Sequence, residues 1–339
     1  MRREVDLAEI AAIASRWGIS PLAVEPVRAA YRVACSEGVV ALKRAKRNAG
    51  RFALVDRLFH HLEGQGFLKT APFLPTLSGK PFCEWDGDLW TVTPWRQGRE
   101  PQYRIHDDIA RCADTLAEFH RAASGFRPPP GLPLRSSLGK WPKKLRRKAD
   151  ALREHLRQAT AAAEPDEFQL VFRHIGPWAI GQLDEAVRKL AGTAYAERCA
   201  WAAEASSLCH GDPSDRNFIL GSDGVPYLID LDSVKLDLPE TDLARLLRRT
   251  MRRTRWDAAM ARSILRAYET RSPLGREARD ILCALLQYPE QVYRLTREYG
   301  EAKARSGQDS ATVILKLARK LRQVCDDRFR CERFWAEFP

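Results

Sequence analysis

The sequence has no run of about eighteen apolar residues, which is the length that a membrane-spanning helix needs. Its first six residues, Met1 to Asp6, contain no apolar segment of the kind found in a secretory signal peptide. None of the eight cysteines forms a Cys-x-x-Cys pair, so the sequence offers no zinc-binding motif. These absences predict a cytoplasmic protein with reduced thiols, no membrane span and no structural zinc.

Negative charge is in the minority. The chain has 44 Asp and Glu residues against 56 Lys and Arg residues, which gives a formal net charge of +12. Between Arg135 and Arg157, nine basic residues face only Asp150 and Glu154. This segment is either a solvated helix face or a surface that repels cations and attracts an anionic ligand or an acidic protein. No nucleic-acid-binding module is recognisable, so nucleic acid is not an expected partner.

Two loops carry the polar groups that suggest chemistry. Cys209-His210-Gly211-Asp212 is followed by Asn217, five positions after Asp212, which is the spacing of a kinase catalytic loop. An apolar triplet at 218–220 and a turn then lead to Ile229-Asp230-Leu231-Asp232. Asp212 and Asn217 alone could be two turn caps. The joint pattern, with strands around both loops, indicates a site for phosphoryl transfer from a nucleotide.

The chemistry assigns a role to each residue. Asp212 is expected to accept a hydrogen bond from the acceptor hydroxyl and to take its proton late in transfer. Asn217 and Asp230 offer the oxygen ligands that Mg²⁺ prefers. Asp232 lies two residues further on, and is either a second metal ligand or the cap of the next turn. His210 is interpreted as a hydrogen-bonding residue that shapes the loop.

A second part of the site is expected upstream. Residues 31–34 and 39–43 read as two strands joined by a turn, and alternation places Ala41 and Lys43 on one face. A small residue and a lysine two positions apart match the strand that packs against adenine and binds the α- and β-phosphates in kinases. Lys43 could also be a solvated lysine, because further basic residues follow. Ser36-Glu37-Gly38 has one glycine, so it predicts a looser phosphate cradle than a glycine-rich loop provides.

These motifs resemble the spore coat protein CotS family, within the aminoglycoside phosphotransferase and choline kinase group of protein-kinase-like folds. The resemblance covers nearly the whole chain, and the matching stretches are 39–44, 61–67, 94–100, 209–212, 229–233, 237–239 and 242–243. The resemblance implies an α+β, two-lobed kinase fold with a mainly antiparallel β N-lobe and a larger helical C-lobe. It also implies ATP and Mg²⁺ as cofactors. Asp212, Asn217 and Asp230 match the catalytic and metal-binding positions of the group, and Lys43 matches its nucleotide lysine.

The nucleotide-binding lobe is expected at residues 1–94 and the catalytic lobe at 95–339. Thr93 and Trp95 flank Pro94, which has no N–H to donate, so these two residues are the expected adenine contacts at the hinge. Kinases pair the strand lysine with a glutamate on the next helix. Here the helix at about 51–63 offers only Asp56 and Glu63, and neither is a convincing partner for Lys43.

The remaining elements follow from hydrophobic periodicity and turn signals. The sequence predicts short strands near 80–85 and 89–94. Helices are predicted at 7–17, 106–123, 141–162, 178–203, 240–271, 275–300 and 309–336. His120, on the helix at 106–123, is interpreted as a packing residue.

The sequence therefore predicts a phosphotransferase that uses ATP and Mg²⁺ to phosphorylate a hydroxyl group on a small molecule or a protein. By resemblance, it is expected in the cytoplasm of the mother cell or assembled into the spore coat with other coat proteins. The alternative is a catalytically silent kinase fold that serves as a structural protein of the coat.

Overall fold

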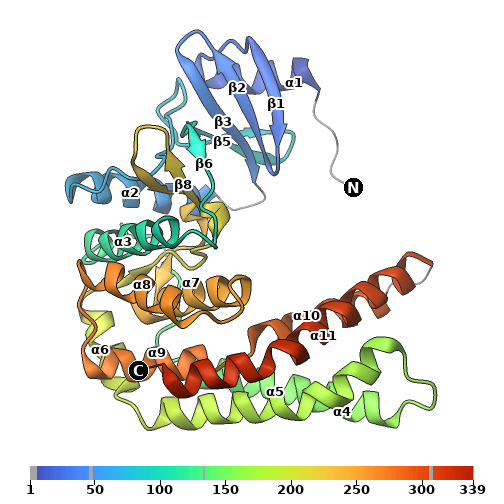
Figure 1. Ribbon diagram of the computed structural model, residues 1–339. Coiled ribbons are helices and arrows are strands. Elements are labelled where there is room, and N and C mark those ends of the chain that lie inside the picture. Colours follow the sequence, from blue (N-terminus) through green and yellow to red (C-terminus); the bar gives the residue numbers. More distant parts are fainter. Residues whose placement is uncertain (1–5, 46–48, 133, 305–307, 339) are drawn as a thin grey trace. The chain divides into compact units, whose positions relative to one another are not determined.

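The computed structural model describes residues 6–45, 49–132, 134–304 and 308–338 (Figure 1). The chain forms two compact units. The first, called here the sheet unit, comprises Met1–Ser136, Ala205–Leu236 and Ala267–Ser272, and the second, the helical unit, comprises Ser137–Glu204, Asp237–Arg266 and Pro273–Pro339. The predicted lobe boundary at residue 94 stays a prediction.

A five-stranded antiparallel sheet forms the first part of the sheet unit, with strand order β1-β2-β3-β5-β4. Its strands are β1 Ala23–Val27, β2 Ala30–Cys35, β3 Gly38–Ala45, β4 Cys83–Trp85 and β5 Asp88–Pro94. The helix α1, Leu7–Ala14, and the 3₁₀ turn Ser15–Trp17 pack on this sheet (Figure 1). Ile10, Ile13 and Trp17 meet the inward side chains of alternate strand residues, among them Val33 and Leu42. The period of each element thus places its apolar residues in one core.

The hairpin of β2 and β3 is the one that the sequence predicts, and α2 at Ala49–Gly64 agrees with the predicted helix. Strand β1 was not predicted. It contains Pro26 and lies at the edge of the sheet, where a residue without an N–H is tolerated.

The rest of the sheet unit carries the two loops of interest. Helix α3, His106–Ala123, has the predicted bounds. A three-stranded sheet consists of β6 Gly98–Arg99, β8 Phe218–Gly221 and β9 Pro226–Leu228. A two-stranded sheet pairs β7 Leu208–Cys209 with β10 Lys235–Leu236. Short 3₁₀ turns occupy Asp215–Asn217 and Leu231–Ser233.

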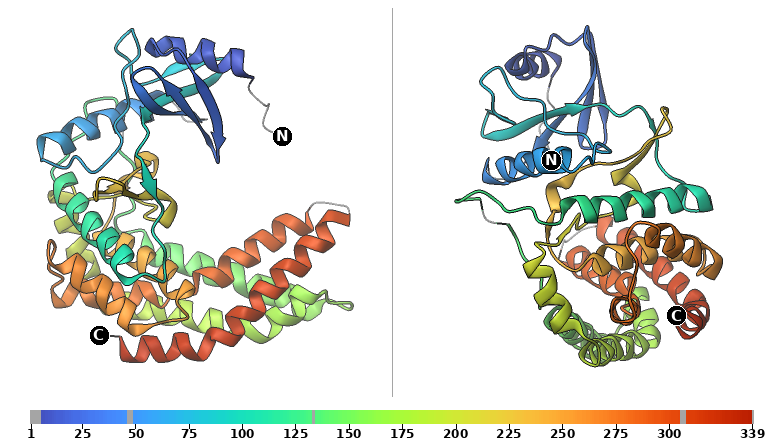
Figure 2. Two further views of the ribbon diagram at one scale, coloured as in Figure 1. Left: turned by 45° about the horizontal axis from the view of Figure 1, so that its top comes forward. Right: turned by 90° about the vertical axis from the view of Figure 1, so that its left-hand side faces the viewer.

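The helical unit is built from α4 Trp141–Ala161, α5 Glu167–Ala191, α6 Tyr195–Glu204, α7 Pro239–Arg253, α9 Arg276–Leu286, α10 Glu290–Lys303, α11 Gln308–Glu337 and most of α8 Ala258–Glu269. Figure 2 shows the long helices α4, α5 and α11 running side by side within it. None of the helices in the described residues is long and apolar enough to cross a membrane.

Three predicted helices are interrupted. The helix predicted from residue 178 begins earlier, at a capping box of Asp166 and Gln169. It continues through the exposed Pro177. A break then separates α5 from α6. The helix predicted at 240–271 breaks into α7 and α8, because Arg255 and Trp256 adopt left-handed backbone conformations. The helix predicted at 275–300 breaks before α10 at Pro289.

Candidate active site

Lys43 meets the second carboxylate loop across 187 residues of sequence. Its Nζ lies 2.9 Å from Oδ1 of Asp230 and 3.3 Å from Oδ2 of Asp232. Lys43 comes from the central strand β3, and both acids follow strand β9. The side chains of Lys43 and Asp230 are 33% and 37% exposed, so the pair remains open to a ligand.

The pair fixes the charge of both groups. Burial opposes the charged form of Lys43, but Asp230 and Asp232 outweigh it and raise the pKa of the ammonium. Burial likewise opposes ionisation of Asp230, and the charge of Lys43 outweighs it and lowers the pKa of that carboxyl. At neutral pH the site therefore holds an ammonium on Lys43 against an ionised carboxylate on Asp230.

The loop after β9 turns sharply at Asp230. Strand β9 ends at Leu228, so Asp230 and Asp232 lie beyond it and strand alternation does not place their side chains. Asp230 has a left-handed backbone, with φ of 63° and ψ of 66°, and the 3₁₀ turn at Leu231–Ser233 follows it. This turn brings both carboxylates to one ammonium. A left-handed conformation is tolerated by aspartate better than by most residues.

The loop that contains Asp212 is tied to the loop of Asp230. His210 is fully buried, its Nε2 lies 2.9 Å from the carbonyl oxygen of Ile229, and its Nδ1 accepts the backbone N–H of Asp212 at 3.2 Å. These bonds fit a neutral ring protonated on Nε2. They agree with the interpretation of His210 as a residue that shapes the loop.

Gly211 allows the two loops to approach each other. Its φ is +85°, and a Cβ atom at this position would lie 2.4 Å from the carbonyl oxygen of Ser233. A larger residue would therefore strain the backbone and separate the loops.

Asn217 is oriented by its own loop. Its side-chain Nδ2 donates to the backbone carbonyl oxygen of Asp212 at 2.8 Å. Its backbone carbonyl oxygen accepts the N–H of Ile229 at 2.9 Å. This backbone hydrogen bond holds the segment of Asn217 beside the segment that leads to Asp230. Within the described residues, Oδ1 of Asn217 accepts no hydrogen bond, which leaves it available to a cation.

Comparison with known proteins bears on this arrangement. Residues 28–282 match the model of the family described as "Phosphotransferase enzyme family", which spans most of the chain and both loops. The chain belongs to this phosphotransferase family.

Individual relatives and solved structures agree with the expected family resemblance and fold. The phosphotransferase is 27% identical over 277 residues to spore coat protein S of Bacillus subtilis, which covers 80% of this chain and 77% of that protein. An aminoglycoside phosphotransferase from Alicyclobacillus acidocaldarius superimposes with a TM-score of 0.81 at 21% identity, over 96% of this chain and 93% of that one. The AMP-bound complex of a spectinomycin phosphotransferase gives 0.69 at 16% identity, over 98% and 99% of the two chains. The predicted kinase-like fold and the resemblance to the CotS family are confirmed.

The expected hinge of the phosphotransferase lies at the end of β5. The backbone N–H of Trp95 donates to the carbonyl oxygen of Val39 at 3.0 Å, and Thr93 is paired with Ala41 in the sheet. The guanidinium carbon of Arg32 lies 5.9 Å from the centre of the Trp95 ring. Because the sheet uses the N–H of Trp95, an adenine contact there would fall to its carbonyl or ring. The roles of Thr93 and Trp95 stay predictions.

Helix α2, which follows β3, contributes an arginine to this region rather than an acidic partner for Lys43. Lys43 forms its ion pairs with Asp230 and Asp232, while Asp56 and Glu63 lie 3.8 and 4.0 Å from His60. Among the described residues, the ion pairs of Lys43 are thus made by the loop after β9 and not by Asp56 or Glu63, neither of which was a convincing partner from the sequence.

Arg51, in the first turn of α2, links that helix to the loop after β9. It is 7% exposed, and its Nη2 donates to the carbonyl oxygens of Asp232 at 2.9 Å and Val234 at 2.7 Å. Sequence reasoning missed this residue. Its only signal was an arginine on the apolar face of the helix.

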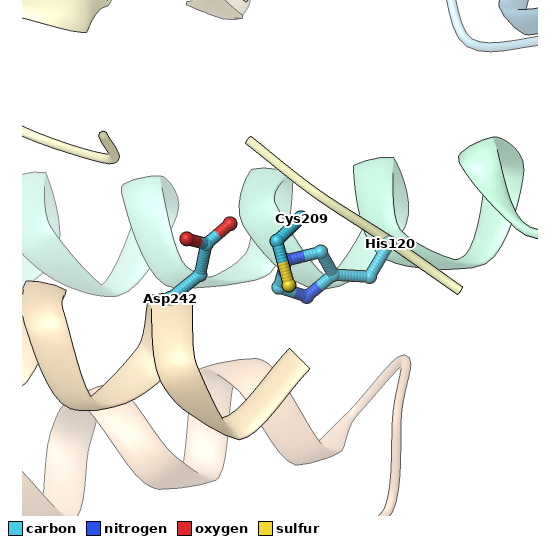
Figure 3. Close-up of side chains that lie close together, drawn as sticks. All are labelled: His120, Cys209 and Asp242. Atoms are coloured by element: carbon cyan, nitrogen blue, oxygen red, sulfur yellow. The ribbon is translucent and has the colours of Figure 1, made fainter. Parts of the chain in front are cut away.

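His120 is a buried residue behind the loop of Asp212. It lies on α3 close to Cys209 of β7 (Figure 3), and its Nδ1 is 2.8 Å from the hydroxyl oxygen of Tyr268. Its 5% exposure agrees with the expected packing role.

The donor atoms of the phosphotransferase suit magnesium. Asp230, Asp232 and Asn217 supply hard oxygen atoms, and Lys43 already places a positive charge against both carboxylates. Such oxygen sets, held on short loops, are those that hold Mg²⁺ beside phosphates. The residues present therefore fit the expected cofactor.

Proposed function

We propose that the protein transfers the γ-phosphoryl group of ATP to a hydroxyl acceptor in a magnesium-dependent reaction. The observation that carries this proposal is the 2.9 Å contact between Lys43 on β3 and Asp230 after β9. It joins the residue type that binds nucleotide phosphates to the residue type that binds the metal. The AMP bound to the similar spectinomycin phosphotransferase supports an adenine nucleotide as the donor.

The residues would divide the work as follows. Asp230 and Asn217 would hold magnesium, with Asp232 as a second carboxylate, and the metal would neutralise charge on the phosphates. The ammonium of Lys43 would also bind the α- and β-phosphates. Asp212 would orient the acceptor hydroxyl and receive its proton as transfer is completed. His210 and Arg51 would keep the two loops in register.

Calorimetry of nucleotide binding tests this proposal. Asp230→Ala should abolish the magnesium-dependent part of ATP affinity, because it removes a metal ligand and leaves the sheet intact. Glu84→Ala, which removes an exposed carboxylate from β4, is the control and should bind Mg·ATP like the native protein. Unchanged Mg·ATP affinity in folded Asp230→Ala protein would contradict the proposal.

A second candidate function is a structural role in the spore coat without catalysis. The 27% identity to spore coat protein S supports it, and so does the lack of a glycine-rich loop before Lys43. We place the enzyme version first because Asp212, Asn217 and Asp230 are all present. Nucleotide binding without any transfer to a broad set of hydroxyl acceptors would favour the structural version.

By the same similarity, we propose that the protein acts in the cytoplasm of the mother cell or within the coat, where other coat proteins would be its partners. Its acceptor would be a small molecule or a protein that carries a hydroxyl group.

A further inference from the structure

The helical unit contains a cavity lined by tryptophan and arginine side chains. It lies among α5, α7, α11 and the start of α10, and has a volume of about 120 Å³. An engineered apolar cavity of about 150 Å³ accommodates benzene. The space therefore suits a flat group of about that size.

Three indoles form an apolar wall of this cavity. The rings of Trp178 and Trp335 are stacked at 12° with centroids 6.0 Å apart, and Trp256 meets Trp335 edge to face at 5.8 Å. Stacked and edge-on aromatic surfaces favour flat apolar partners.

One of these indoles is held there by an unfavourable backbone. Arg255 and Trp256 are consecutive non-glycine residues with φ of 55° and 65°. The N–H of Trp256 donates to the carbonyl oxygen of Met251 at 2.8 Å, which closes the end of α7. Strained backbone of this kind occurs preferentially at ligand-binding sites.

The charged residues of the lining carry an excess of positive charge. Four arginines, at positions 248, 249, 252 and 328, face two acids, Glu290 and Asp327. The acids are already engaged, since Arg248 lies 3.4 Å from Glu290 and Arg330 lies 2.9 Å from Asp327. Arg328 is paired with Glu332 outside the lining.

Arg252 is the exception among these arginines. Among the described residues it makes no hydrogen bond or ion pair, although it is only partly exposed. Burial, and then the neighbouring Arg294 and Arg253, lower its pKa, while Glu290 acts against them. A half-buried guanidinium without a counterion favours an anionic ligand.

Two of the tryptophans that line the cavity have indole N–H groups without a partner in the part of the chain that the structure describes. The Nε1 atoms of Trp178 and Trp335 are shielded from solvent and have no acceptor within the described residues. A buried N–H without a partner is costly, and an oxyanion would provide the missing acceptor.

We propose that this cavity binds a small organic oxyanion, a carboxylate or a phosphate monoester, whose flat apolar part lies against the tryptophan wall. Arg252 pairs with the oxyanion, and the indole N–H groups of Trp178 and Trp335 supply further hydrogen bonds. This binding requires neither nucleotide nor magnesium, so it does not rest on the proposed phosphotransfer.

Calorimetry on the full chain without nucleotide tests the inference. The probes are benzoate and phenyl phosphate, with benzyl alcohol and benzylamine as neutral and cationic counterparts. At least one of the two anions should bind, at least tenfold more tightly than either counterpart, and the tighter anion identifies the headgroup. Equal binding of benzyl alcohol, or no binding by either anion, would overturn the inference.

Matched variants assign the binding to the cavity. Arg252→Gln should weaken the anion at least tenfold. Arg276→Gln, which removes a 95% exposed arginine of the same unit outside the cavity lining, should leave it unchanged. Trp335→Phe keeps an aromatic ring and removes one N–H, and should weaken the anion by a smaller factor. Native affinity in folded Arg252→Gln protein would show that the cavity is not an anion site.

Discussion

At the scale of single residues, Asp212 and Asp230 are two carboxylates that the fold holds by different contacts. Asp230 is paired with Lys43 at 2.9 Å, whereas the backbone N–H of Asp212 is held by His210 and its carbonyl by Asn217. Loss of Asp230 should therefore act on binding, and loss of the Asp212 carboxylate should act on turnover.

Asp212→Asn tests this division. The amide has nearly the size of the carboxylate but cannot take a proton, so we expect kcat to fall at least a hundredfold, within the range of general base catalysis. Mg·ATP affinity by calorimetry should stay within about twofold of the native value. A parallel loss of affinity and rate would place Asp212 at the metal instead.

The place of Asp212, Asn217 and Asp230 on two loops beside short strands was predictable, because their types and spacings are local signals, whereas their roles stay predictions. The sequence did not predict Arg51 as the link between α2 and the loop after β9. Arg51 bonds to backbone carbonyls about 180 residues away, and no residue type marks an accepting carbonyl. The partner of Lys43 was missed for a related reason, since the lysine meets Asp230 only after the whole sheet unit has folded.

At the scale of elements, the basic residues of α4 differ in how exposed they are. Lys143, Arg146 and Arg147 are exposed, whereas Lys144 donates to Ser137 Oγ at 2.9 Å and lies 5.1 Å from the ring centre of Trp141. The exposed residues are therefore the ones that could attract an acidic partner.

Reversal of Lys143, Arg146 and Arg147 to glutamate should weaken binding of a fluorescent polyglutamate peptide, most clearly at low ionic strength. Exposed charges are screened over about 8 Å at physiological salt. Fluorescence anisotropy at low and high salt measures the effect. The control reverses three other exposed arginines of the unit, at positions 188, 276 and 333. Equal weakening by both triple variants would show only a net-charge effect and leave α4 a solvated face.

Lys148 lies on the same helix but is less exposed. Its Nζ donates to the hydroxyl of Tyr288 at 2.8 Å and lies 3.8 Å from the centre of the Tyr293 ring. Burial, with Arg248 and other nearby arginines, lowers the pKa of Lys148 to about 8, although Glu290 acts in the opposite direction.

The free energy of unfolding should therefore depend on pH through Lys148. An unfolded lysine has a pKa of about 10.4, so between about pH 8 and pH 10.4 the unfolded chain binds more protons and the native state gains stability as pH rises. Partial exposure limits the gain to about 1 kcal/mol. Lys148→Met should remove this rise in urea unfolding, and Lys143→Met, on the exposed face, should keep it. A rise that persists in Lys148→Met would assign it to another group.

The elements themselves were predicted where one period persists, as in α1, α3 and the β2–β3 hairpin. Periodicity failed at breaks that keep the helical pattern on both sides. Trp256 is apolar and fits the period of a continuous helix, so nothing in the pattern reveals its left-handed backbone. The small strands β6, β7 and β10 have two residues each, too few for alternation to appear.

At the scale of the whole molecule, the sequence predicted the kinase-like fold through motifs that lie mostly within the sheet unit. The cavity of the helical unit was not foreseen. Its lining comes from four separate stretches between Trp178 and Trp335, and each stretch alone reads as an ordinary amphipathic or basic helix.

The ion pairs of Lys43 have a consequence for how the chain matures. Two carboxylates on one tight turn would repel each other, but the ammonium on β3 acts as a built-in counterion. We therefore expect the newly made protein to complete this loop without a divalent cation. We expect EDTA to leave the midpoint of thermal unfolding within about 1 °C of its value in buffer alone, unlike proteins whose folding depends on metal. A lower midpoint in EDTA would mean that the cation, rather than the lysine, holds the turn together.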